Sequence, residues 1–105
     1  MPQPGNQLRS FWPPPTPTLG ELVFYTLDDT DVRVITRQRL GRSERGTPVR
    51  AGQVFPAVMV RVDEAGQDGP CNLTVFLDGP DTYWAQKAAR GGISGTWSWP
   101  SPTGV

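Results

Sequence analysis

Six prolines lie within the first 17 residues of this 105-residue chain, at positions 2, 4, 13, 14, 15 and 17. Each proline fixes its own φ angle and removes a backbone hydrogen-bond donor, and it also disfavours helix at the residue before it. Residues 1–20 are therefore predicted to form an extended arm, largely in the polyproline II conformation. Residues 21–105 would then form one small domain.

The arm also carries three large apolar side chains, Leu8, Phe11 and Trp12. A solvated tail has no need of such residues. We therefore expect them to anchor the arm on a surface, either of this domain or of a neighbouring protein. Because the arm is already extended, docking it loses less chain entropy than docking a flexible tail would.

Beyond the arm, short runs of β-branched and aromatic residues alternate with turn-forming residues. Such runs are typical of strands, and we predict strands at 22–27, 32–36, 54–62, 71–77 and 96–100. Segments 28–31 and 78–81 are predicted turns, and 37–53 a long loop. Segment 82–85 begins either a strand or a helix, and alanine-rich 85–90, which ends at Gly91-Gly92, is the one helix-prone stretch.

These elements predict an all-β domain of about five to six short strands. A small SH3-like barrel fits the length best, and a compact sandwich is the alternative. In the strand at 71–77, the alternation points Cys71, Leu73, Val75 and Leu77 inward. Trp84 and Trp97 are expected to close the core, whereas Trp12 is the better interface candidate.

The side chains needed for most catalytic and metal sites are missing. The chain has no histidine and one cysteine, Cys71, which excludes Ser-His, Cys-His and His-metal sites and an internal disulfide. Asp78 and Asp81 flank a Gly-Pro pair and are expected to cap that turn. We therefore predict no catalytic residue, metal or cofactor, and a protein that is not an enzyme.

The charge balance disfavours two classes of partner. Ten Lys+Arg equal ten Asp+Glu, so no overall field attracts nucleic acid or an acidic membrane. The sequence has neither an apolar run of membrane-spanning length nor the pattern of a signal peptide. We expect the chain to stay in a reducing cytoplasm, or in a particle assembled there, without membrane contact.

One segment nevertheless has a directional charge. Residues 33–50 contain six arginines and a single acid, Glu44. We predict that Arg39, Arg42 and Arg45 contact a protein partner, and a merely solvated loop is the alternative. Nucleic-acid phosphates are a weaker option, because the segment lacks the interleaved aromatic residues used for base stacking.

The C-terminal half contains the segments 72–79 (NLTVFLDG) and 95–100 (GTWSWP), with Asp81 and Trp84 between them. Through these segments the chain resembles, over about residues 54–100, a group of small proteins encoded by tailed bacteriophages. The chain departs from the group after Trp84, where residues 85–90 are alanine-rich instead of polar. The resemblance implies a phage source but no particular site.

With that source, the small domain, the missing catalytic residues and the arm point to a virion structural protein. We expect an auxiliary capsid protein, of the decoration or cement type, whose arm binds the major capsid protein or another virion protein. A neck or tail component is the first alternative, and a host-directed SH3-like binding module the second. A homo-oligomer is compatible with each of them.

Overall fold

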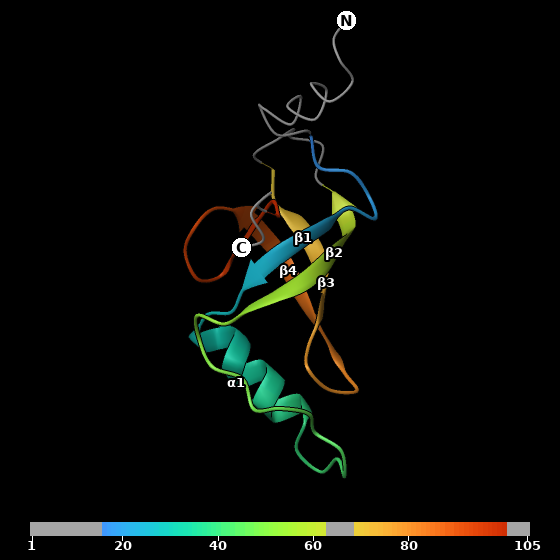
Figure 1. Cartoon of the computed structure of the whole chain (residues 1–105), viewed down its shortest axis with the longest axis vertical. Coiled ribbons are helices and arrows are strands. Elements are labelled where there is room, and N and C mark those ends of the chain that lie inside the picture. The colour runs from blue at the N-terminus through green and yellow to red at the C-terminus, as the bar shows by residue number, and fades with distance from the viewer. Residues whose placement is uncertain (1–15, 63–68, 101–105) are drawn as a thin grey trace, which may run out of the picture.

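A computed structural model of the chain describes residues 16–62 and 69–100. In this part, five strands form a closed barrel and one helix lies at one end of it (Figure 1). In chain order the elements are β1 (Leu22–Thr26), α1 (Asp29–Gln38), β2 (Val54–Val62), β3 (Cys71–Phe76), β4 (Thr82–Arg90) and β5 (Thr96–Ser98). The expected anchors Leu8, Phe11 and Trp12 lie outside the described residues.

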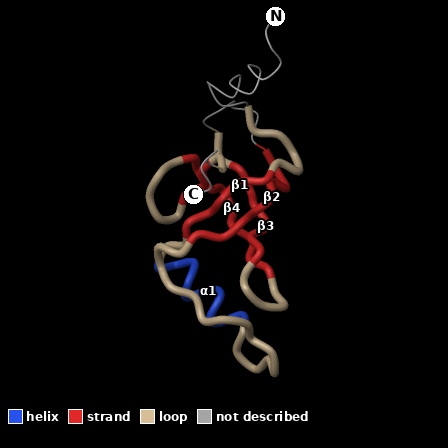
Figure 2. Tube along the Cα trace, viewed as in Figure 1, coloured by secondary structure: helices blue, strands red, loops and turns tan. Residues whose placement is uncertain are grey.

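The strands β2, β3 and β4 form an antiparallel meander, and β1 pairs antiparallel with β2 (Figure 2). The short strand β5 closes the barrel, because it pairs parallel to β4 on one side and antiparallel to β1 on the other. The predicted all-β class is confirmed, and the closed five-stranded barrel is consistent with a small SH3-like barrel.

The barrel interior is filled by alternate residues of each strand, as period-two packing requires. Cys71, Leu73, Val75 and Leu77 are all buried, which confirms the predicted inner face of β3. The β5 residue Trp97 is 0% exposed. The other side chains of the hydrophobic core are those of Val23, Tyr25, Leu27, Ile35, Val49, Ala57, Met59, Tyr83, Ala85 and Ala88.

The predicted turn and strand over 28–36 are wrong, because this segment forms α1. Asp28 is its N-cap: the Asp28 carboxylate accepts the Asp31 N–H, and the Asp31 carboxylate accepts the Asp28 N–H, each at 2.8 Å. This reciprocal pair stabilises a helix start. Ile35 then packs in the core while Val34 is exposed, so the apolar residues follow a helical period and not the alternation of a strand.

The predicted helix over 85–90 is also wrong, because these residues belong to β4. Ala85 pairs with Leu73, and Ala88 with Cys71, across a β-bulge. At the bulge, Lys87 adopts a positive φ of 54° and its N–H donates to Oδ1 of Asn72 at 2.8 Å. Ladder bonds to β3 and β5 and the burial of Ala85 and Ala88 outweigh the high helix propensity of alanine.

Candidate functional site

The outside of the barrel exposes large apolar side chains on several neighbouring strands. Strand pairing aligns Leu22 of β1 with Val58 of β2, Val58 with Thr74 of β3, and Thr74 with Trp84 of β4. Leu22 is 49% exposed and Trp84 58%. We call this row, together with its outward-facing neighbours Phe24, Pro56, Val60 and Phe76, the outer apolar band.

The band follows the curvature of the barrel. Its row crosses four of the five strands that close the barrel, so it passes around more than half of the circumference. A single flat partner therefore cannot cover all of it. Exposed apolar residues that lie together on neighbouring strands, unlike scattered single ones, mark candidate interaction sites.

The N-terminal arm leaves the barrel beside this band. The Gly20 N–H donates to the Met59 carbonyl at 2.8 Å, and the Met59 N–H donates to the Glu21 carbonyl at 3.0 Å. Pro17 is buried, whereas Leu19 is exposed. Gly20 and Glu21 are therefore held to β2, next to Leu22 at one end of the row.

The structure gives Arg39 an internal role. Its Nε and Nη2 donate to the two carboxylate oxygens of Asp81 at 2.9 and 3.1 Å, and its Nη1 donates to the Thr47 carbonyl at 2.8 Å. Both side chains of the ion pair are about 5% exposed. The Arg39 hydrogen bonds hold the pKa of Asp81 below its usual value, against the opposing effect of burial, with a smaller contribution from Gln38.

The expected capping role of Asp78 and Asp81 is thereby replaced by longer-range contacts. Asp81 binds Arg39 across 42 residues of sequence. The Asp78 carboxylate accepts the Thr47 hydroxyl at 2.8 Å, and the Asp78 carbonyl accepts the Thr47 N–H at 2.8 Å. The two acids fasten the arginine-rich loop to the turn between β3 and β4.

Arg42 and Arg45 are exposed, unlike Arg39. The Nε of Arg45 donates to the Arg42 carbonyl at 3.0 Å. Within residues 16–62 and 69–100, no acidic side chain forms an ion pair with either arginine. Contact of Arg42 and Arg45 with a partner stays a prediction, and the positions of both side chains are compatible with it.

A buried polar cluster joins α1 to the barrel. The hydroxyls of Tyr25 in β1 and Tyr83 in β4 donate to the Asp31 carboxylate at 2.7 and 2.6 Å. Burial, together with these hydrogen bonds to an acid, raises the pKa of both tyrosines far above the usual value. Because the three groups satisfy one another away from solvent, the cluster is structural.

Trp84 was expected in the core and instead faces outward. The strand alternation contains the signal, since Tyr83 and Ala85 on either side of it are buried. The ambiguity over helix or strand at 82–85 concealed that alternation. The contacts of Arg39 with Asp81 and of Asp31 with Tyr83 leave no sequence signal of this kind, because they join residues 42 and 52 positions apart.

Comparison with known proteins found no match to this chain: no family model fits it, and no curated protein or solved structure is significantly similar. In the described part, no group of three or more acidic or cysteine side chains could hold a metal ion. No described helix has the length and apolar character needed to cross a membrane.

Proposed function

We propose that this chain is a structural protein of a tailed-bacteriophage particle, assembled in the host cytoplasm. Its specific role is that of an auxiliary capsid protein, of the decoration or cement type, which binds the major capsid protein through its N-terminal arm. The outer apolar band carries this proposal. A chain whose apolar surface passes around more than half of a barrel is suited to an environment with neighbours on several sides.

The position of the arm supports the same role. The Gly20–Met59 hydrogen bond fixes the last residue of the predicted arm beside Leu22, which supports one contact surface shared by the arm and the band. Leu8, Phe11 and Trp12 would supply the anchors of the arm, and Trp84 and Phe76 the exposed aromatic rings of the band. Aromatic side chains at protein interfaces contribute a large share of the binding energy.

The internal polar groups favour binding over catalysis. The Asp31 carboxylate is buried and occupied by two tyrosine hydroxyls, and the Asp81 carboxylate is buried and occupied by Arg39. Neither acid is placed to accept a proton from a substrate. Both instead fix α1 and its following loop to the barrel.

A protein inventory of purified phage particles by mass spectrometry is the first test. Many copies per particle are expected for a decoration protein. About a dozen copies or fewer would assign the chain to the neck or tail instead. Absence from the particle would refute the proposal and favour the host-directed module.

The binding of the purified protein to phage particles that lack it tests the role of the arm and the outer apolar band. Deletion of residues 1–15 and the substitution Trp84→Ser should each weaken binding by about tenfold or more, while circular dichroism shows a folded barrel. Ile93→Ser is the matched control, because Ile93 is also exposed and apolar but belongs to the loop between β4 and β5 and not to the band. Equal binding by all three variants would refute the role of the arm and the band.

A further inference from the structure

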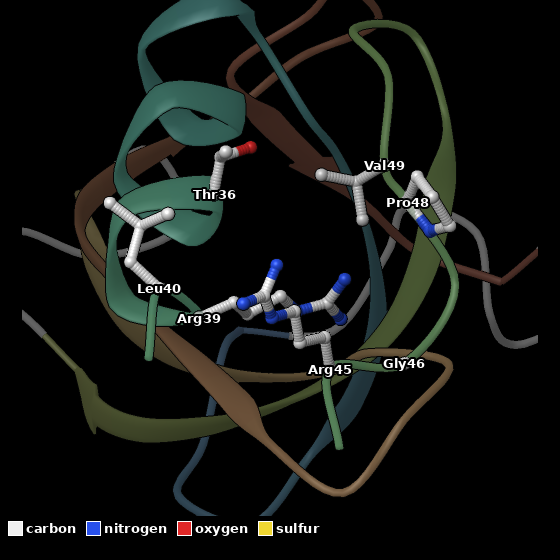
Figure 3. A pocket seen from close by; sticks show the side chains of 7 residues that line it. All are labelled: Thr36, Arg39, Leu40, Arg45, Gly46, Pro48 and Val49. Carbon is white, nitrogen blue, oxygen red and sulfur yellow. The ribbon is translucent and has the colours of Figure 1, made fainter. Parts of the chain in front are cut away.

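A pocket of about 170 Å³ lies between the last turn of α1 and the arginine-rich loop. Figure 3 shows Leu40 on one side, Pro48 and Val49 on the other, and the guanidinium groups of Arg39 and Arg45 between them. The pocket is therefore apolar at its sides and cationic in between. It lies at the end of the barrel with α1, opposite the end where residues 16–20 are found (Figure 1).

The loop that forms this pocket is fixed before any ligand arrives. Arg39 and Asp78 each hold Thr47, at 2.8 Å. Gly46 has a φ of 76°, and a Cβ at this position would come within 2.6 Å of the Asp78 carbonyl oxygen. Only glycine fits there, so the loop packs closely on the turn after β3. A preformed site avoids most of the ordering cost of binding.

The two guanidinium groups differ in their charge balance. Arg39 is neutralised by Asp81 through two hydrogen bonds. Arg45 has no acidic partner in the described part of the chain, and its hydrogen bond to the Arg42 carbonyl leaves both terminal nitrogens for a ligand. A guanidinium presented in this way matches a carboxylate, which it can bind through two parallel hydrogen bonds.

The volume limits the ligand to one residue. An apolar cavity of about 150 Å³ holds one benzene molecule, so about 170 Å³ accommodates one medium side chain. The same residue must fill the apolar sides and bring a carboxylate to Arg45. A C-terminal residue with an aliphatic side chain carries both groups, whereas in an internal aspartate or glutamate the carboxylate ends the very side chain that would have to fill the apolar sides.

We propose that this pocket binds the C-terminal residue of a partner polypeptide. The aliphatic side chain of that residue packs between Leu40 and Val49, and its carboxylate pairs with Arg45. None of the residues that line the pocket belongs to the outer apolar band, and residues 16–20 lie at the opposite end of the barrel, so this site is distinct from the proposed capsid contact.

Nuclear magnetic resonance titration of the full chain with N-acetyl-leucine tests the site. We expect saturable shifts of the Leu40 and Val49 methyl signals and of the Arg45 Nε signal. Two probes serve as controls: N-acetyl-leucinamide has no carboxylate, and N-acetyl-glutamate α-amide has a carboxylate only on its side chain. Each should bind at least about tenfold more weakly than N-acetyl-leucine. Equal binding by either probe would overturn the assignment, as would the absence of shifts with N-acetyl-leucine.

A pair of variants tests whether Arg45 is the residue that binds the ligand carboxylate. Arg45→Gln should weaken N-acetyl-leucine binding by about tenfold or more. Arg42→Gln removes the same charge three residues away, does not line the pocket and keeps the carbonyl that holds Arg45; it should change binding by less than about twofold. Equal effects of the two substitutions would refute the site, whereas the particle-binding test of the arm would be unaffected.

Discussion

The Tyr83 hydroxyl donates a 2.6 Å hydrogen bond to the carboxylate of Asp31, 52 residues earlier in the chain. One of these residues belongs to β4 and the other to the first turn of α1. Tyr25 binds the other oxygen of the same carboxylate. The helix is thus held to two strands of the barrel by the buried carboxylate of Asp31, which also forms the capping box with the N-cap residue Asp28.

Tyr25 and Tyr83 should make the fold unstable at high pH. Burial and the bonds to Asp31 raise the pKa of Tyr25 and Tyr83, so the fold favours their neutral forms. Their contribution to stability is complete below the pKa of a free tyrosine, about 10, and is lost as the pH rises above it. These are the only tyrosines in the chain. Tyrosinate absorbance should therefore appear only together with unfolding measured by circular dichroism, and a tyrosine that titrates near pH 10 in the folded protein would contradict this.

The Arg39–Asp81 pair should be sensitive to loss of either partner. Asp81→Ala leaves a guanidinium that is 6% exposed without its counter-charge, which should cost about 3–5 kcal/mol of unfolding free energy. Asp78→Ala is the control in the same turn: its side chain is exposed and loses one hydrogen bond, worth about 1 kcal/mol. Urea unfolding at neutral pH measures both, and similar losses would refute the role of the ion pair.

The Arg39–Asp81 pair should also make the stability of the fold depend on pH in the acidic range. Because Arg39 lowers the pKa of Asp81, the folded state favours the carboxylate. This stability is present above the pKa of a free aspartate, about 4, and is lost as the pH falls through the lowered value. Asp81→Asn should therefore show a smaller loss of stability on acidification than the wild type. An unchanged acid dependence in urea unfolding would contradict the assignment.

The parts of the fold that local sequence determines were predictable. The strands around 22–26, 54–62 and 71–76 have β-branched runs bounded by turns, and Cys71 to Leu77 alternate as a half-buried strand should. The helix was missed although its signal is local, since Asp28 and Asp31 have the spacing of a capping box. The alternation of Val32 and Val34 suggested a strand over the same residues.

The candidate site was less predictable because its geometry depends on pairing between distant segments. The sequence of the arginine-rich loop does not distinguish Arg39, which binds Asp81, from Arg45, which faces the pocket. The outer apolar band likewise exists only through the alignment of Leu22, Val58 and Trp84 on different strands. Both faces of β1 are apolar, so periodicity alone does not identify its outward side.

Lys87 offers a stabilising substitution. It is the only non-glycine residue of the described part with a positive φ, a conformation that costs an ordinary residue about 1 kcal/mol. Lys87→Gly removes this strain and keeps the backbone bond to Asn72, so it should raise the unfolding free energy by up to about 1 kcal/mol. Gln86→Gly, one residue earlier, should instead lower it. Chemical denaturation decides the sign, and a destabilised Lys87→Gly protein would contradict the prediction.

Trp97 should contribute most to the stability of the barrel. The three-residue strand β5 has few ladder bonds, so burial of Trp97 must hold it between β1 and β4. Its ring packs edge-on against Trp99, with the ring centroids 5.0 Å apart. At about 25 cal/mol per Å² and about 200 Å² of buried surface, Trp97 contributes several kcal/mol. Trp97→Ala should therefore cost about 3–5 kcal/mol and yield little folded protein.

Two further variants separate the packing of Trp97 from its polar group. The indole N–H of Trp97 is buried without an acceptor in the described residues, so Trp97→Phe removes an unsatisfied donor and should cost clearly less than Trp97→Ala. Trp84→Ala is the matched control, because Trp84 is exposed, and it should stay within about 1 kcal/mol of the wild type. Denaturant melts compare all three. If Trp97→Ala were as stable as Trp84→Ala, β5 would be held by its backbone pairing, and the barrel would not depend on this side chain.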